Sequence, residues 1–384
     1  MRPIDILALA LQTPGSLPPL VWGPPGVGKS AQFRQLSAGL DLPLEVVIGS
    51  IREPADFSGL PIPNNGEGVR LEPPSWAVRL AKAGRGLLFL DEASCAAPAV
   101  QAAMLRVVLE KVVGDLQLPD GVLIAAAANP PDEAAGGWDL AAPLANRFVH
   151  LQWGSPTVAE WSDWLLTNGD GTVSAIPRVD PAAWAAEWPN ARALVAAFLR
   201  RKPECLAEPV QARAGRFPLA YATPRTWECA TRLLVTVRAT GADEALMPLF
   251  AGALGEGVAL TLATWLREND LPDPEALLAR PESWKPNANK TDVIFAVCLA
   301  VTEAAVAKDR GGKAYTKTQR KERWCNCWRV LERALPFGKD LVCVPARKLA
   351  APANKPCDGA LLEESVRAII RQLGEVVGAA GIVS

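Results

Sequence analysis

Histidine is almost missing from this chain of 384 residues, which contains one, His150. A single histidine excludes metal sites and proton relays that need several imidazoles, and we assign His150 no role. The eight cysteines are scattered, and Cys325-Asn326-Cys327 has neither a second pair nor a nearby histidine to complete a zinc-site spacing. We therefore expect reduced, structural thiols.

The chain also lacks a net charge, with 40 basic and 41 acidic residues. Such a balance gives no overall field that would attract nucleic acid or an anionic membrane. Long apolar runs are missing as well, since the stretch 293–301 is only about half of a membrane span. Asp5 and Gln12 interrupt the apolar residues at the start, where a signal peptide would be continuous. We expect a soluble, cytoplasmic protein.

The length allows more than one domain. Up to about residue 152, short apolar runs alternate with helix-like segments, which predicts an α/β fold with a parallel sheet flanked by helices. Beyond that point we expect helices only, because no strand pattern is convincing.

One glycine-rich stretch organises the N-terminal part: Gly23-Pro24-Pro25-Gly26-Val27-Gly28-Lys29-Ser30. It follows an apolar run and precedes a helix-like segment, the context in which such a loop binds phosphates. Backbone N–H groups and the helix N-terminus would surround the phosphates. Lys29 would reach the β- and γ-phosphates and Ser30 would bind Mg²⁺. A plain strand-to-helix turn is the structural alternative.

Two carboxylates, Asp91 and Glu92, end the apolar run 87–90. Acidic residues at the carboxyl end of a buried parallel strand lie beside the phosphate loop. Asp91 would hold Mg²⁺, and Glu92 would orient or deprotonate the attacking water. A residue that caps the next helix is the structural alternative for Asp91.

Asn129 ends the next apolar strand. Its side chain would lie between the Asp91 strand and the strand before the phosphate loop, where it could position the attacking water. An asparagine that simply opens the Asn-Pro turn explains the pattern equally well.

These residues together resemble AAA+ ATPases, with Walker A at Gly23–Ser30, Walker B at Leu87–Glu92 and sensor 1 at Asn129. Two further segments resemble the MoxR branch, namely Arg52-Glu53-Pro54-Ala55-Asp56-Phe57-Ser58-Gly59-Leu60-Pro61 and Ala127-Ala128-Asn129-Pro130. The resemblance covers residues 1–275 or so and implies an AAA+ core with bound ATP and Mg²⁺.

The resemblance also implies two catalytic arginines. Arg147 matches the arginine finger, which reaches the γ-phosphate held by a neighbouring subunit, and Arg225 matches sensor 2, which contacts the γ-phosphate of its own subunit. The structural alternatives are an arginine at a helix C-terminus for Arg147 and a helix start capped by Thr223 for Arg225.

The same resemblance implies a domain organisation and partners. It divides the chain into an ATPase core at 1–152, a helical lid at 153–284 and a C-terminal helical extension at 285–384. Two hairpin inserts, at about 60–72 and 111–119, would line the pore or face of a ring. An arginine finger that acts on a neighbouring subunit requires a ring, and the resemblance implies that this ring is a hexamer. A protein client and a partner with a von Willebrand factor A domain are implied as well.

Three functions remain open at this stage. The first is a MoxR-type ATPase that remodels or activates a protein partner. The second is a nucleotide-dependent nucleic-acid machine, either clamp-loader-like or a restriction-type translocator. It is supported by the basic stretch 310–323 and by inserts that the resembling family shares with such machines. The third is a scaffold that binds ATP for assembly with little hydrolysis.

Overall fold

The computed structural model describes residues 1–64, 68–130, 138, 140–166, 175–207, 219–269, 271–310, 313–356 and 364–374. Contacts divide the chain into two compact units, one formed by Met1–Val179 with Ala207–Leu260 and the other by Asp180–Leu206 with Thr261–Ser384. The expected lid at 153–284 is shared between these units. The three expected segments remain a prediction of domain boundaries.

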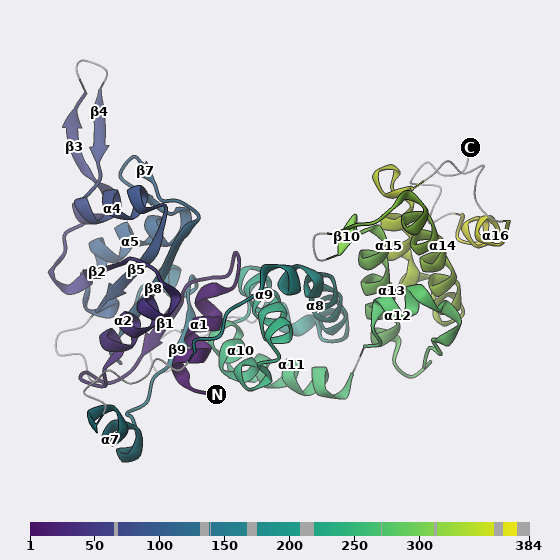
Figure 1. Cartoon of the computed structure of the whole chain (residues 1–384), viewed down its shortest axis with the longest axis horizontal. Coiled ribbons are helices and arrows are strands. Elements are labelled where there is room, and N and C mark those ends of the chain that lie inside the picture. The colour runs from purple at the N-terminus through teal and green to yellow at the C-terminus, as the bar shows by residue number, and fades with distance from the viewer. Residues whose placement is uncertain are drawn as a thin grey trace. The chain divides into compact units, whose positions relative to one another are not determined.

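The first unit contains a five-stranded sheet in the order β2-β5-β8-β1-β9, in which all four pairings are parallel (Figure 1). Its elements are α1 (Pro3–Gln12), β1 (Pro19–Trp22), α2 (Lys29–Leu40), β2 (Leu44–Ile48), α3 (Ala55–Ser58), β3 (Leu60–Pro63), β4 (Val69–Glu72), α4 (Ser75–Ala83), β5 (Arg85–Asp91), α5 (Pro98–Glu110), β6 (Val112–Val113), β7 (Leu116–Gln117), β8 (Gly121–Ala128), α6 (Ala142–Ala145), β9 (Val149–Gln152), α7 (Val158–Leu166), α9 (Pro224–Thr240) and α10 (Leu246–Leu254).

Continuous apolar strands form the core of this sheet. Leu87, Leu88, Phe89 and Leu90 of β5 are fully buried, as expected for a parallel strand that is covered on both faces. On one face, the ring of Phe33 from α2 stacks on Phe89, with 4.1 Å between ring centroids. The predicted α/β fold, a parallel sheet flanked by helices, is confirmed.

Two small antiparallel hairpins extend the sheet unit. β3 pairs with β4 from Leu60 to Glu72, and β6 pairs with β7. Figure 1 shows β3 and β4 projecting away from the sheet. Gly114, in the β6–β7 turn, has φ 60°, a left-handed conformation that glycine adopts readily. The N–H of Leu71 donates to Asp115 Oδ2 at 2.7 Å and joins the two hairpins.

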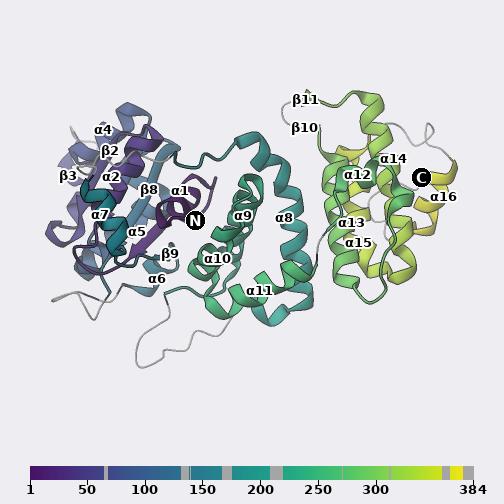
Figure 2. The ribbon, with the colours of Figure 1, turned by 60° about the horizontal axis from the view of Figure 1, so that its bottom comes forward.

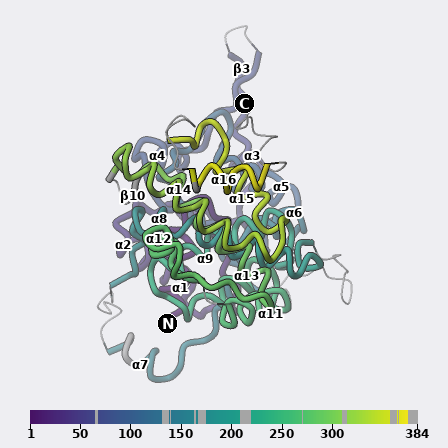
Figure 3. The backbone as a smooth tube through the Cα atoms, turned by 90° about the vertical axis from the view of Figure 1, so that its right-hand side faces the viewer, coloured from purple at the N-terminus to yellow at the C-terminus, as the bar shows by residue number. Residues whose placement is uncertain are grey.

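The second unit is helical, apart from a short hairpin. Its elements are α8 (Pro181–Arg201), α12 (Pro274–Ala279), α13 (Thr291–Val306), β10 (Asp309–Arg310), β11 (Lys313–Ala314), α14 (Lys317–Ala334), α15 (Lys339–Ala350) and α16 (Glu364–Gln372), while α11 (Glu256–Glu268) begins in the first unit and ends in the second. Figure 3 shows α16 lying near α14, with which it is in contact.

The expectation of helices alone beyond residue 153 was wrong at β10 and β11. Each of these strands has two residues, which is too short to produce an alternating apolar pattern. Within the described ranges, no helix combines the length and the apolar character needed to cross a membrane.

Candidate functional site

The loop Gly23–Ser30 joins the end of β1 to the start of α2. Gly26 and Gly28 have φ 82° and 88°, a left-handed conformation that side chains with a Cβ rarely adopt. A Cβ at either position would meet nothing within 4 Å, so these glycines are required by backbone conformation rather than by space. The loop therefore curls as predicted, and α2 begins at Lys29 with its N-terminus toward the loop.

Lys29 lies across the loop and is 9% exposed. Its Nζ donates to Gly23 O at 2.7 Å, to Pro24 O at 2.8 Å and to Asn129 Oδ1 at 2.8 Å. These contacts hold the ammonium at the loop, the position from which a lysine binds an anion.

Ser30 and Asp91 meet at the carboxyl end of β5. The Ser30 hydroxyl donates to Asp91 Oδ2 at 2.6 Å, and the Glu92 N–H donates to Asp91 Oδ1 at 3.0 Å. A hydroxyl and a carboxylate are the hard oxygen ligands that Mg²⁺ prefers. The residues present therefore fit the metal predicted for this position.

Asn129 follows β8, which lies between β5 and β1 in the sheet. The prediction that Asn129 would lie between these two strands is confirmed. Besides its bond to Lys29, its backbone carbonyl accepts from the Ser94 hydroxyl at 3.2 Å. The structure thus brings together the phosphate loop, Asp91 and Asn129, which are far apart in sequence.

Glu92 is held in an unusual conformation. Its φ of 55° and ψ of 38° are left-handed, which is uncommon for a residue other than glycine and occurs often at functional sites. The hydroxyl of Ser50, in the short 3₁₀ turn Gly49–Ile51 after β2, donates to Glu92 Oε2. Sequence reasoning missed Ser50, because its relation to Glu92 depends on β2 lying beside β5, which no local pattern shows.

The two predicted arginines lie close to one another. Arg147 follows α6, and its Nη1 donates to Pro143 O, while Arg225 is exposed in the first turn of α9. Burial, and then the positive charge of Arg225, lower the pKa of Arg147, whereas Tyr221 raises it. In the described part of the chain, neither arginine hydrogen-bonds to the phosphate loop.

The structural alternative for Arg225, a helix start capped by Thr223, is present. Thr223 accepts from the Thr226 N–H at 3.2 Å, and Thr226 reciprocates to form a capping box ahead of Pro224. Arg225 therefore has a defined place at the start of α9, and its side chain remains exposed.

No family model matches this chain, and no curated protein does. Among solved structures, it is similar to a protein from Cytophaga hutchinsonii described as a "putative ATPase", with 17% identity and a TM-score of 0.45. The similarity covers 70% of this chain and 88% of that one. At this level the similarity carries no argument about activity, which depends on the residues of the site.

Two other features from the sequence lie outside this site. Among the described residues, no group of three or more histidine, cysteine or acidic side chains could hold a metal ion, and Cys325 and Cys327 are buried on α14. In the basic stretch, Arg323 Nη2 donates to Glu275 Oε1 at 2.7 Å and its guanidinium lies over the Tyr315 ring. Arg323 is therefore part of the packing of the second unit.

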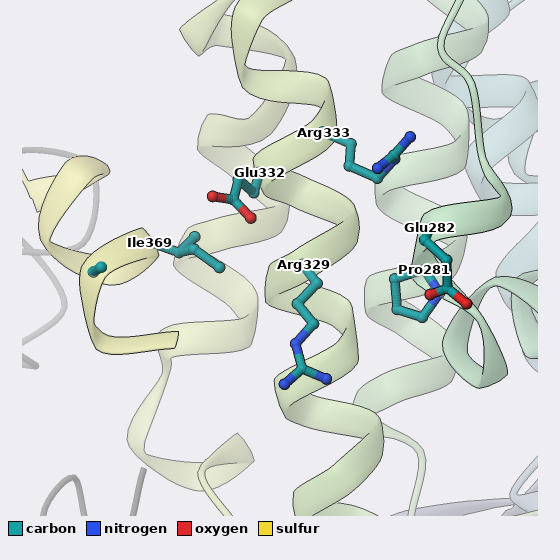
Figure 4. A pocket seen from close by; sticks show the side chains of 7 residues that line it. Pro281, Glu282, Arg329, Glu332, Arg333 and Ile369 are labelled. Atoms are coloured by element: carbon teal, nitrogen blue, oxygen red, sulfur yellow. The ribbon is translucent and has the colours of Figure 1, made fainter. Parts of the chain in front are cut away.

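The second unit has a shallow cavity of about 390 Å³ (Figure 4), lined by Pro281, Glu282, Arg329, Glu332, Arg333, Ala368 and Ile369. Two of the lining arginines already have structural partners: Arg329 donates to Asn326 Oδ1 at 2.7 Å, and Arg333 donates to Trp284 O at 2.8 Å. Both signs of charge line the cavity, and no catalytic grouping is present among these residues.

Proposed function

We propose that this protein is a MoxR-type AAA+ ATPase that hydrolyses Mg-ATP at the boundaries of a ring and uses the energy to remodel or activate a protein partner. One observation carries the proposal. Two hydrogen-bonded pairs, Lys29 with Asn129 and Ser30 with Asp91, meet at the phosphate loop. A loop that served only as a turn would not need these pairs.

Each side chain has a role in this mechanism. Lys29 exchanges its uncharged acceptors for β- and γ-phosphate oxygens. Ser30 and Asp91 would hold Mg²⁺, which neutralises charge on the phosphates when it is bound. Glu92 orients the attacking water and accepts its proton, and Asn129 hydrogen-bonds to that water on the other side. The hydrogen bond from Ser50 engages Glu92 Oε2 and leaves Oε1 to accept the proton.

The arginines support a site shared between subunits. Arg147 would reach the γ-phosphate of the neighbouring subunit, where a guanidinium stabilises the charge of the transferring group. Arg225 was expected to act on its own subunit's nucleotide. Its positive charge lowers the pKa of Arg147, and a role for both arginines at the neighbour's nucleotide is the alternative to that expectation.

A protein client would contact the projecting hairpin β3–β4. Leu60 and Val69 on this hairpin are 62% and 65% exposed, so both are accessible to an apolar surface of a client. Proteins that co-purify with Glu92→Gln in ATP would identify the client and any von Willebrand factor A domain partner. An equal set of proteins recovered with Lys29→Ala would contradict nucleotide-dependent binding.

ATP turnover by the purified full-length chain tests the chemistry. We expect turnover by the wild type, about 100-fold less by Glu92→Gln, and loss of nucleotide binding by Lys29→Ala. Wild-type turnover no faster than that of Glu92→Gln, with nucleotide still bound, would instead indicate an ATP-binding scaffold. Nucleic-acid binding that weakens with salt and stimulates turnover would favour the nucleic-acid machine.

Mixed rings test the shared site. Arg147→Ala subunits keep an intact phosphate loop, and Lys29→Ala subunits keep an intact finger, so a mixture of the two regains turnover when Arg147 acts in trans. The same test places Arg225. Rescue of Arg225→Ala by Lys29→Ala indicates action on the neighbour, whereas rescue by Arg147→Ala indicates action on its own nucleotide.

A further inference from the structure

His150, the only histidine, lies in the middle of β9 and is 6% exposed. Both of its ring nitrogens have partners. Trp22 Nε1 lies 2.8 Å from His150 Nδ1, and His150 Nε2 lies 2.9 Å from Ala145 O. Trp22 is the last residue of β1 and Ala145 is the last residue of α6, so the imidazole joins two elements that are not adjacent in sequence.

The partners determine the protonation of the ring. An indole N–H can only donate and a carbonyl oxygen can only accept, so Nδ1 accepts from Trp22 and Nε2 carries the proton that goes to Ala145. This is a neutral imidazole in one tautomer. A proton added at Nδ1 would face the Trp22 N–H and break that hydrogen bond.

The hydrogen bonds of His150 to Trp22 and to Ala145 form a bridge, and each end of this bridge lies next to a part of the proposed active site. Trp22 immediately precedes Gly23, whose carbonyl accepts from Lys29 Nζ at 2.7 Å. Ala145 lies two residues before Arg147, and Arg147 is anchored in turn on Pro143 O of the same short helix. The imidazole therefore lies between the strand that leads into the phosphate loop and the segment that carries the proposed finger.

The backbone of His150 is also confined. Gly252 of α10 packs so closely against it that a Cβ at position 252 would lie 2.2 Å from His150 O. Figure 2 shows α6, β9 and α10 close together. With four residues, α6 is too short to hold its own orientation, so its position depends on such contacts.

We infer that His150 is a positioning residue for ATP hydrolysis, which holds the α6–Arg147 segment at a set distance from the phosphate-loop strand through its hydrogen bonds to Ala145 and Trp22. The inference rests on the proposed function. His150 is buried with both ring nitrogens bonded to protein groups, so it acts through Arg147. Its loss therefore impairs the finger that a subunit offers to its neighbour and leaves that subunit's own phosphate loop competent.

The main test is His150→Phe, which keeps an aromatic ring and removes both hydrogen bonds. We expect a fluorescent ATP analogue to bind within about 2-fold of wild type and turnover to fall at least about 10-fold, since small misplacements of a reacting group have large effects on rate. Mixing with Lys29→Ala subunits restores turnover, because these supply an intact finger. Mixing with Arg147→Ala subunits does not, because both variants lack a working finger.

Two further variants separate positioning from stability. His150→Gln can donate and accept, and we expect it to keep turnover within about 3-fold of wild type. Thr236→Val removes a buried hydrogen bond of the same unit, the 2.8 Å contact with Thr13 between α9 and α1, and we expect turnover close to that of wild type. A loss in Thr236→Val as large as in His150→Phe would overturn the inference.

A measurement without substitution tests the bridge itself. Because the chain has one histidine, labelling with ring-¹⁵N histidine gives one pair of ring signals from the full-length protein. We expect a protonated Nε2 and an unprotonated Nδ1 at pH 7. The opposite tautomer, or a charged ring, refutes the bridge even where His150→Phe does not fold.

The mixing experiments distinguish failure of the proposed site between subunits from failure of the proposed role of His150. Failure of Lys29→Ala to rescue Arg147→Ala contradicts the shared site itself. Rescue of Arg147→Ala without rescue of His150→Phe contradicts only the role of His150. Rescue of His150→Phe by Arg147→Ala instead places the defect in the phosphate loop and also overturns the inference.

Discussion

Lowering the pH from 7 to 5 is expected to destabilise the first unit through His150. Burial lowers the pKa of His150 from 6.5 to about 4, an effect that its hydrogen bond to Ala145 opposes only in part. The unfolded chain therefore binds a proton at a higher pH than the folded chain. The stabilisation is complete above pH 6.5 and is lost as the pH falls toward 4.

The size of the effect follows from the two pKa values. Each unit of difference corresponds to about 1.4 kcal/mol, so the whole contribution of His150 is about 3 kcal/mol. Between pH 7 and pH 5 the unfolded imidazole becomes charged while the folded one stays neutral, which lowers the free energy of unfolding by about 2 kcal/mol.

Urea unfolding at both pH values, followed by tryptophan fluorescence, measures this difference. His150→Gln provides the matched control, since glutamine does not titrate and all carboxylates are unchanged. We expect the wild type to lose about 2 kcal/mol more than His150→Gln over this range. Equal losses in the two proteins would mean that the imidazole is not confined between Trp22 and Ala145 as described.

Three substitutions test other parts of the site. Ser50→Ala frees Glu92 Oε2, so we expect basal ATP turnover to rise about 2- to 5-fold at unchanged nucleotide affinity, a factor worth under about 1 kcal/mol. A fall in turnover would contradict the view that Ser50 restrains Glu92. Gly28→Ala places a Cβ on a residue with φ 88°, which costs about 1–2 kcal/mol. We therefore expect nucleotide affinity to fall about 10-fold in a binding titration. Unchanged affinity would mean that the loop does not need this left-handed backbone conformation. Phe33→Ala removes the stacking on Phe89 and is expected to lower the free energy of unfolding by about 3–5 kcal/mol in urea; a loss below about 1 kcal/mol would mean that this packing is loose.

The phosphate loop, Asp91 and Asn129 could be placed from the sequence because parallel strands end at one edge of a sheet. Each residue follows an apolar run, and the runs are recognisable one at a time. Given a parallel sheet, their side chains must converge, whatever the details of the connecting helices. Long-range geometry followed here from local patterns alone.

Ser50 and His150 could not be placed in this way. Ser50 matters because β2 lies beside β5, and His150 matters because β9 lies beside β1. Strand order is a property of the whole sheet and leaves no trace in the local sequence of either residue. A solitary histidine at the end of an apolar run looks like ordinary core, and only its two partners show otherwise.

The proximity of Arg147 and Arg225 has a consequence for assembly. The positive charge of Arg225 lowers the pKa of Arg147, so the two guanidinium groups repel one another. Within the described residues, neither has a carboxylate partner. An anion placed between them would replace this repulsion with two charge-assisted attractions. If the mixed rings show that both arginines act on the neighbour, that anion is the γ-phosphate on the neighbour's Lys29, and binding of nucleotide and association of subunits then stabilise each other. Reciprocal linkage then requires ATP to strengthen the oligomer by the same factor by which oligomerisation strengthens ATP binding.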